Sequence, residues 1–219
     1  MRKNYDRELE VLNHNIIEMA AFVERAILNA LTALETRDAD LAKRVIKRDE
    51  EVDDMERDIE DMCLSLILRQ QPVASDLRFI SAALKIITDL ERIGDHAQDI
   101  SEISLAMPDS PLSSELDAVL KMYNESSYMI KTAVDAFITR DEDLANEAIA
   151  HDDVVDQLFV DFKDQIIEDL KGGSKDAEEY IDLLQISKYL ERVGDHAENI
   201  AEWVIFSITG EHVDVDFEE

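Results

Sequence analysis

Apolar residues recur every three or four positions along this chain, and the pattern continues over six long stretches. Within residues 76–106, for example, Ile86, Ile93, Ala97 and Ile100 fall on one side of a helical wheel. Such a stripe is typical of an amphipathic helix packed against a core. No stretch alternates between apolar and polar residues as a half-buried strand does. The pattern therefore predicts an all-α protein.

Glycine and proline mark the ends of these stretches. The chain has only five glycines and three prolines, and all but Gly94 and Gly194 lie at breaks in the apolar pattern or beside the C-terminal tail. Both residue types interrupt helices, so the intervals between them predict long helices. Asp38 and Asp141 are the expected N-caps of two of these helices. The six predicted helices cover residues 5–35, 38–70, 76–106, 113–138, 141–170 and 175–208.

The chain also contains an internal repeat. Residues 90–100 read LERIGDHAQDI and residues 190–200 read LERVGDHAENI, with eight of eleven positions identical. Upstream, residues 36–53 match residues 139–156 at ten of eighteen positions. The offsets of 103 and 100 residues are too long for a solenoid unit. They predict two pseudo-symmetric three-helix bundles, or one six-helix body with the same symmetry. The predicted units are residues 1–107, residues 112–210 and an acidic tail at 211–219.

Charge and cysteine content exclude several functional classes. The 52 acidic and 22 basic residues give a formal net charge of -30. Nucleic acid and anionic membrane both require clustered Lys and Arg, so neither is expected as a primary partner, and no basic patch is expected. Cys63 lies in an apolar series and is predicted to be a small buried hydrophobic residue. Without a signal peptide or an apolar run of membrane-spanning length, the expected location is the cytoplasm.

Gly94 and Gly194 occupy matching positions in the middle of predicted helices. Glycine there costs about 1 kcal/mol relative to alanine. Either a close approach between helices or a site beside the backbone would explain the retention of both glycines. We favour the close approach.

Acidic residues at one-turn spacing form the main chemical pattern. Glu91, Asp95 and Asp99 follow one another at intervals of four and share a helix face. Carboxylates on adjacent helices can converge on a cation, and oxygen ligands suit Mg, Ca, Mn or iron. A solvated acidic face is the alternative interpretation, and the residues alone leave both open. The candidate metal ligands are Asp49, Asp53, Glu91, Asp95, Asp99, Asp152, Asp156, Glu191 and Asp195.

Other chemistry-bearing residues are predicted to be structural. We expect His96 and His196 to be hydrogen bonded, and Arg92 and Arg192 to form salt bridges with a neighbouring helix. No Glu-x-x-His occurs, so the ligand set of ferritin-like di-iron proteins is missing. No pattern resembles a nucleophile with its base or a phosphate-binding loop. A non-enzymatic protein is expected, and a metal-dependent oxidase or hydrolase of helical-bundle type is the alternative.

The repeated LER(I/V)GDHA motif, preceded in each half by an acidic DxxxD helix, resembles the PhoU family of bacterial and archaeal phosphate-signalling proteins. The resemblance extends over residues 5–209. It implies two symmetric three-helix bundles that bind iron or zinc, often as clusters, through (E/D)xxxD motifs. Asn199 stands where Asp99 is expected to repeat, and Val154 where Glu51 is. We therefore expect the two metal sites to differ in affinity or nuclearity.

The same resemblance implies a function. It indicates a regulator that couples the phosphate ABC transporter, through its ATPase, to a two-component sensor histidine kinase. Such a regulator represses the phosphate-starvation response when phosphate is plentiful. The implied location is the cytoplasmic side of the inner membrane, reached through protein partners, and a homodimer is compatible with it.

Overall fold

The computed structural model describes residues 2–72, 74–107, 115–173 and 177–212. Six helices and no strand occur in these ranges, which confirms the all-α prediction. The predicted break at 108–111 and the acidic tail from residue 213 onward lie outside the described residues. The helices are α1 (Arg2–Thr36), α2 (Ala39–Gln70), α3 (Ser75–Ala106), α4 (Glu115–Thr139), α5 (Glu142–Lys171) and α6 (Ala177–Thr209).

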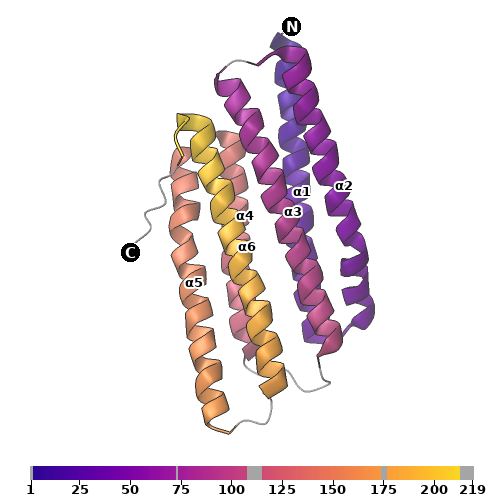
Figure 1. Ribbon diagram of the computed structural model, residues 1–219, viewed down its shortest axis with the longest axis vertical. Helices are drawn as coiled ribbons and strands as arrows, with labels where there is room; N and C mark the ends of the chain where they lie inside the picture. The colour runs from indigo at the N-terminus through magenta and orange to yellow at the C-terminus, as the bar shows by residue number, and fades with distance from the viewer. Residues whose placement is uncertain (1, 73, 108–114, 174–176, 213–219) are drawn as a thin grey trace.

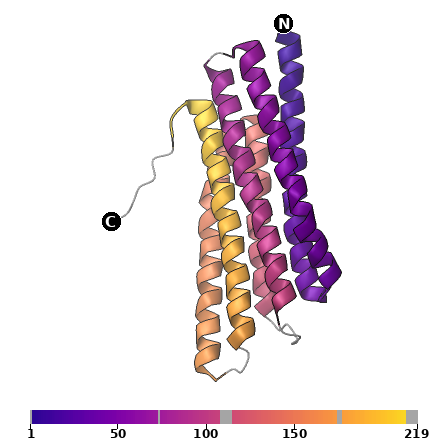
Figure 2. The same ribbon diagram turned by 45° about the vertical axis from the view of Figure 1, so that its right-hand side comes forward.

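The six helices form two groups of three that lie side by side (Figure 1). Helices α1, α2 and α3 pack on one another, as do α4, α5 and α6. The groups are joined where α3 packs on α6 and α1 packs on α4. Figures 1 and 2 show α2, α3, α6 and α5 as a front layer in that order, with α1 and α4 behind. The two predicted bundles therefore make one six-helix body.

One apolar core extends through both halves. Leu12 and Ile16 of α1, Ile86 of α3 and Val193 of α6 are all fully buried in it. Cys63 is also buried, as predicted, and burial raises the pKa of its thiol to about 12. None of the described helices combines the length and apolar character needed to cross a membrane.

The turns into α2 and α5 repeat the same local structure. Arg37 and Arg140 adopt left-handed backbone conformations, with φ of 56° and 55°. The next residue in each case caps the following helix. Asp38 Oδ1 accepts two backbone N–H groups at 3.0 and 2.9 Å, and Asp141 Oδ1 accepts two at 3.0 and 3.2 Å. Both predicted N-caps are confirmed, and each satisfies backbone donors that the first helical turn leaves open.

Both mid-helix glycines lie where two helices approach closely. A Cβ built on Gly94 would lie 3.1 Å from Cγ1 of Val52 on α2. A Cβ on Gly194 would lie 3.3 Å from Cγ1 of Val155 and 3.0 Å from Oδ1 of Asp152, both on α5. The matching glycines thus allow α3 to rest on α2 and α6 to rest on α5 at the same level. At Gly194 the backbone also adjoins a candidate ligand, so both explanations apply there.

The two copies of the repeated motif cross at the contact between α3 and α6. The rings of His96 and His196 lie 5.7 Å apart between centroids. His196 Nδ1 lies 2.9 Å from Asp89 Oδ1, and the matching contact places the rings of His96 and Tyr189 5.2 Å apart. These contacts exchange under the repeat, which indicates a local pseudo-twofold axis, and Figure 1 shows α3 and α6 running antiparallel. The histidines therefore have the structural role that the sequence predicts.

Replacing Gly94 with leucine tests the close approach. We expect Gly94→Leu to lower the free energy of unfolding by about 1–3 kcal/mol, because the side chain would overlap Val52. Urea unfolding followed by circular dichroism measures this change. The double variant Gly94→Leu/Val52→Ala should lose less stability than the sum of its single variants, because truncating the valine makes room. Strict additivity would show that the two positions do not interact.

Candidate metal centres

Three carboxylates converge in the second half of the molecule. Asp152 and Asp156 of α5 and Asp195 of α6 each offer one oxygen, and these oxygens lie within 4.8 Å of one another. Oxygens bound about 2.3–2.6 Å from a calcium ion are separated by about 5 Å at most. One cation can therefore contact all three side chains. We call Asp152, Asp156 and Asp195 the α5–α6 cluster.

Asp152 supplies the strongest indication that this cluster fits a cation. Its Oδ1 is buried, and among the described residues it has no hydrogen-bond partner. Burial raises the pKa of Asp152 to about 7, and the charges of Glu198, Asp156 and Asp195 add to the shift. A buried carboxylate oxygen without a partner is costly. A bound cation would satisfy that oxygen and remove the repulsion.

Glu198 also belongs to this site, although the sequence analysis did not include it. It lies one turn beyond Asp195 on α6. Burial raises its pKa to about 7, with further contributions from Glu202 and Asp195. The sequence carried a signal, because Glu198 lies seven residues after Glu191 and so shares its helix face. Its counterpart Gln98 is neutral, and the search for acids retained in both halves therefore missed it.

Glu191 is the fourth predicted ligand of the second half. Its carboxylate accepts from Lys188, one turn earlier on α6, and forms an ion pair with it. Its charge also contributes to the raised pKa values of Asp156 and Asp195, after the larger effect of burial. Glu191 therefore lies beside the α5–α6 cluster but is neutralised by a lysine. Glu191 could bind a cation only if its ion pair with Lys188 were broken.

The first half brings together the five predicted acids of α2 and α3. Burial raises the pKa of Asp49 to about 6, and the charges of Asp95, Asp53 and Asp99 raise it further. Burial likewise raises the pKa of Glu91 to about 7, with Asp95 as the next contribution. Carboxylates of α2 and α3 therefore contribute to one another's raised pKa values. We call Asp49, Asp53, Glu91, Asp95 and Asp99 the α2–α3 cluster.

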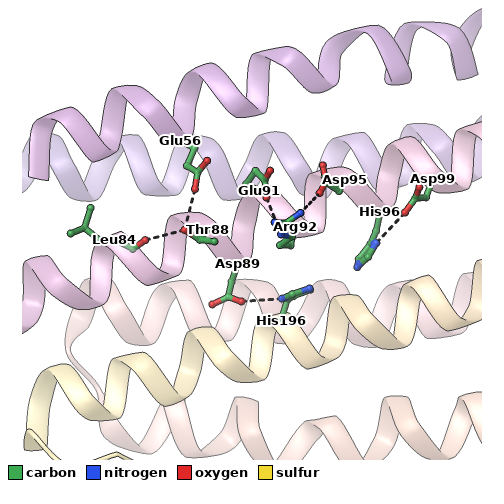
Figure 3. Close-up of polar contacts among 10 residues, drawn as sticks. All are labelled: Glu56, Leu84, Thr88, Asp89, Glu91, Arg92, Asp95, His96, Asp99 and His196. Atoms are coloured by element: carbon green, nitrogen blue, oxygen red, sulfur yellow. Dashed lines mark hydrogen bonds and ion pairs between the residues drawn. The ribbon is translucent and has the colours of Figure 1, made fainter.

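Arg92 neutralises part of the α2–α3 cluster from within the same helix. Its Nη1 lies 3.0 Å from Asp95 Oδ2, and its Nε lies 3.5 Å from Glu91 Oε2 (Figure 3). The prediction that Arg92 bridges to a neighbouring helix is therefore wrong. A guanidinium reaches residues one turn away on its own helix, and here that turn already presents two carboxylates. Arg192 is exposed.

A second arginine adds to the difference in charge between the two clusters. Arg57 Nη2 lies 3.4 Å from Asp53 Oδ2, whereas the repeat places the uncharged Val160 at the matching position of α5. Within the described residues, three acidic side chains meet the geometry of a cation site only in the α5–α6 cluster. The two halves therefore differ: arginines pair with acids of the α2–α3 cluster, whereas in the second half Lys188 pairs with Glu191 and three other acids converge.

Asp99 and Glu56 connect the α2–α3 cluster to its surroundings. Asp99 Oδ2 lies 3.5 Å from Nδ1 of His96, which extends from α3 toward α6 (Figure 3). Glu56 Oε1 accepts from the Thr88 hydroxyl at 3.0 Å. Glu56 was not predicted, although it lies one turn after Asp53 on α2. Asp99 thus joins the cluster to the contact between the halves.

The donors in both clusters are carboxylate oxygens. The imidazole rings of His96 and His196 lie at the α3–α6 contact, where His196 faces Asp89. Oxygen-only sets favour hard cations such as Mg, Ca and Mn, and they also accept iron. Zinc sites more commonly include nitrogen or sulfur ligands. With Asp156 exposed, a cation in the α5–α6 cluster would keep positions open for water or for groups from a partner.

Comparisons with known proteins agree with the duplicated architecture. The PhoU domain model matches the chain twice, over residues 16–104 and 119–204. A protein of Clostridium acetobutylicum described as a phosphate-specific transport system accessory protein PhoU homolog is 36% identical over 216 residues. That match covers 98% of this chain and 99% of the relative. A similarly described homolog of Thermotoga maritima is 33% identical, covering 96% of this chain and 91% of the relative.

Solved structures show the same fold. The crystal structure of PhoU from Pseudomonas aeruginosa matches with a TM-score of 0.86 at 31% identity, covering 94% of this chain and all of that one. The phosphate transport system regulatory protein PhoU from Streptococcus pneumoniae matches with a TM-score of 0.88 at 28% identity, covering 96% of this chain and all of that one.

The unequal clusters predict unequal metal affinities. In a titration of metal-free protein with Mn²⁺, we expect a tighter site at the α5–α6 cluster and a weaker one at the α2–α3 cluster. Asp195→Ala should weaken the tighter site by more than about tenfold, because one ligand and one negative charge are lost. Asp95→Ala should affect only the weaker site. Equal affinities in the unmodified protein would contradict the asymmetry.

The raised pKa values predict how stability depends on pH. The carboxyls of Asp49, Glu91, Asp152 and Glu198 have folded-state pKa values of about 6 to 7, above the roughly 4 of unfolded chains. The folded protein therefore binds more protons between about pH 4 and 7, and its stability falls as pH rises through this window. Urea unfolding in chelator should show lower stability at pH 8 than at pH 5.

A matched variant and added metal test the same dependence of stability on pH. Asp152→Asn should flatten the decline, because an amide does not titrate. Added Mn²⁺ should stabilise the protein more at pH 8 than at pH 5, because cations and protons compete for the same oxygens. Stability that rises from pH 5 to pH 8 in chelator would contradict the assignment.

Proposed function

This chain belongs to the PhoU family, and we propose that it is a non-enzymatic regulator of phosphate uptake. One observation carries this proposal: the match to a phosphate-specific transport accessory protein covers 98% of this chain and 99% of the relative. Both halves of the domain are present at matching positions. The proposal therefore concerns the whole six-helix body rather than a shared fragment.

The proposed partners are the ATPase of the phosphate ABC transporter and a phosphate sensor histidine kinase. The relatives' description as transport-system accessory proteins supports the first partner. A net charge of -30 opposes direct contact with anionic lipid. In this proposal the protein reaches the inner membrane through a protein surface and holds the kinase in its repressing state when phosphate is plentiful.

Metal ions have a structural or modulating role in the proposed function. Each cluster bridges two helices, α2 with α3 or α5 with α6, and like charges in each cluster repel. A bound cation would draw the two helices of each pair together. Because α3 and α6 meet at the repeated motif, a change in either cluster acts next to the contact between the halves.

A strain lacking the gene tests the regulatory role. In phosphate-rich medium, we expect its phosphate-starvation genes to be expressed as they are in starved cells, because the repressing contact is lost. A plasmid carrying the unmodified gene should restore repression. Reporter expression measures the effect. Unchanged repression in the deletion strain would overturn the proposal.

Purified proteins test the partners and the role of metal separately. The unmodified protein should co-purify with the transporter ATPase and with the kinase. The variant Asp95→Ala/Asp195→Ala, with one substitution in each cluster, should bind less metal. If it still binds both partners, the metal modulates signalling rather than building the contact surface. Failure of the unmodified protein to bind either partner would leave the coupling role without support.

A further inference from the structure

A cavity of about 150 Å³ opens between α1 and α2, beside the first half's closely packed glycine. Gly94 and Ala97 of α3 line its inner part. Three arginines also line it: Arg25 from α1, and Arg44 and Arg48 from α2. Asp49 lies in the same lining. We call this cavity the arginine pocket.

The arginines of this pocket differ in how far they are already paired. Arg48 is fixed, because it lies 4.6 Å from the centroid of the Phe22 ring and bonds Glu51 at 2.8 and 3.0 Å. Among the described residues, Arg44 forms one long ion pair, with Nη2 3.8 Å from Asp38 Oδ2, and its side chain is 60% exposed. Within the described part of the chain, Arg25 forms no ion pair. Two guanidinium groups thus keep most of their donors available.

The second half shows that the fold does not require arginines here. The repeat places Tyr128, Glu147 and His151 at the three matching positions. These side chains have polar partners within their own half: the Tyr128 hydroxyl donates to Glu147, and His151 Nε2 lies 2.8 Å from Oε2 of Glu125. The rings of Tyr128 and His151 lie 4.7 Å apart. The same location therefore carries one aromatic ring, one carboxylate and one imidazole in the second half, where the first half has three arginines.

We propose that the arginine pocket binds one small oxyanion of the phosphate class. Guanidinium groups match the oxygens of such an anion with paired N–H donors. Asn29 lines the same pocket and offers an amide donor. At about 30 Å³ for each water, the cavity holds about five waters, enough for a tetrahedral ion but not for a nucleoside.

Asp49 links this pocket to the α2–α3 cluster. It lines the pocket and is also one of the clustered acids. Without a cation, its negative charge opposes an anion nearby. With a cation on the cluster that charge is offset, so anion and cation binding should strengthen each other, and the effect must be reciprocal.

The inference goes beyond the proposed function, because a regulator that acts through partners does not need an anion site of its own. The test is calorimetric titration of the full chain with sodium phosphate, with sodium chloride at equal ionic strength as the reference. We expect saturable binding of one phosphate per chain. Arg44→Gln should weaken it about 10- to 100-fold, because a charge-assisted contact is lost.

Arg69→Gln is the matched control, because it removes the same charge from the exposed C-terminal turn of the same helix. It should bind phosphate as the unmodified protein does, and circular dichroism should show both variants folded. Equal weakening in both variants would assign the effect to overall charge and overturn the site. No saturable binding at about 10 mM phosphate would also overturn it.

Two further ligands define the specificity. Sulfate binding comparable to phosphate would support a general oxyanion site, and sodium phosphate binding that sulfate at equal concentration does not displace would restrict the site to phosphate. Added Mn²⁺ should tighten phosphate binding in the unmodified protein but not in Asp49→Asn. Binding is measured on the isolated protein, so failure here leaves the partner experiments unaffected, and failure of those experiments leaves this site unaffected.

Discussion

The antiparallel contact of α3 with α6 is the interaction on which the rest of the molecule depends. The repeated motif supplies both sides of it and serves three neighbours at once. Its glycine lets α3 or α6 lie against the preceding helix, its histidine faces the other half, and its acids lie on the remaining face. A helix has room for these separate tasks because residues one or two positions apart point in different directions, whereas residues four positions apart share a face. This geometry explains why the motif is retained in two copies.

Local signals made most of the fold predictable. Periodicity, the two aspartate caps and the placement of glycine and proline act within a few residues, and the chain's long helices leave few alternatives. The contacts that the sequence did not predict depend on convergence in space. Glu198 was hidden because Gln98, its counterpart, is neutral. The ion pairs of Arg92 depend on which carboxylates its own helix presents, and the arginine pocket joins residues from three separate helices.

The acidic clusters do not stabilise the fold by themselves, because their carboxylates are partly buried and repel one another. Burial and mutual repulsion hold the pKa values of several carboxyls near 6 to 7. These groups are consequently poised between binding a proton and binding a cation. In the α2–α3 cluster, Arg57 and Arg92 already offset part of the charge. The α5–α6 cluster has Val160 in place of Arg57, and within the described ranges Oδ1 of Asp152 has no hydrogen-bond partner.

Duplication usually gives two equal sites, but small substitutions here separate the two halves. Replacement of Arg57 by Val160 leaves the acids of the second half free to converge. The second half has Tyr128, Glu147 and His151 where arginines line the pocket of the first half. The half better arranged for a cation is therefore not the half that carries the proposed oxyanion site. Since α3 and α6 join the halves through the same motif, two different ligands would act on opposite sides of one contact.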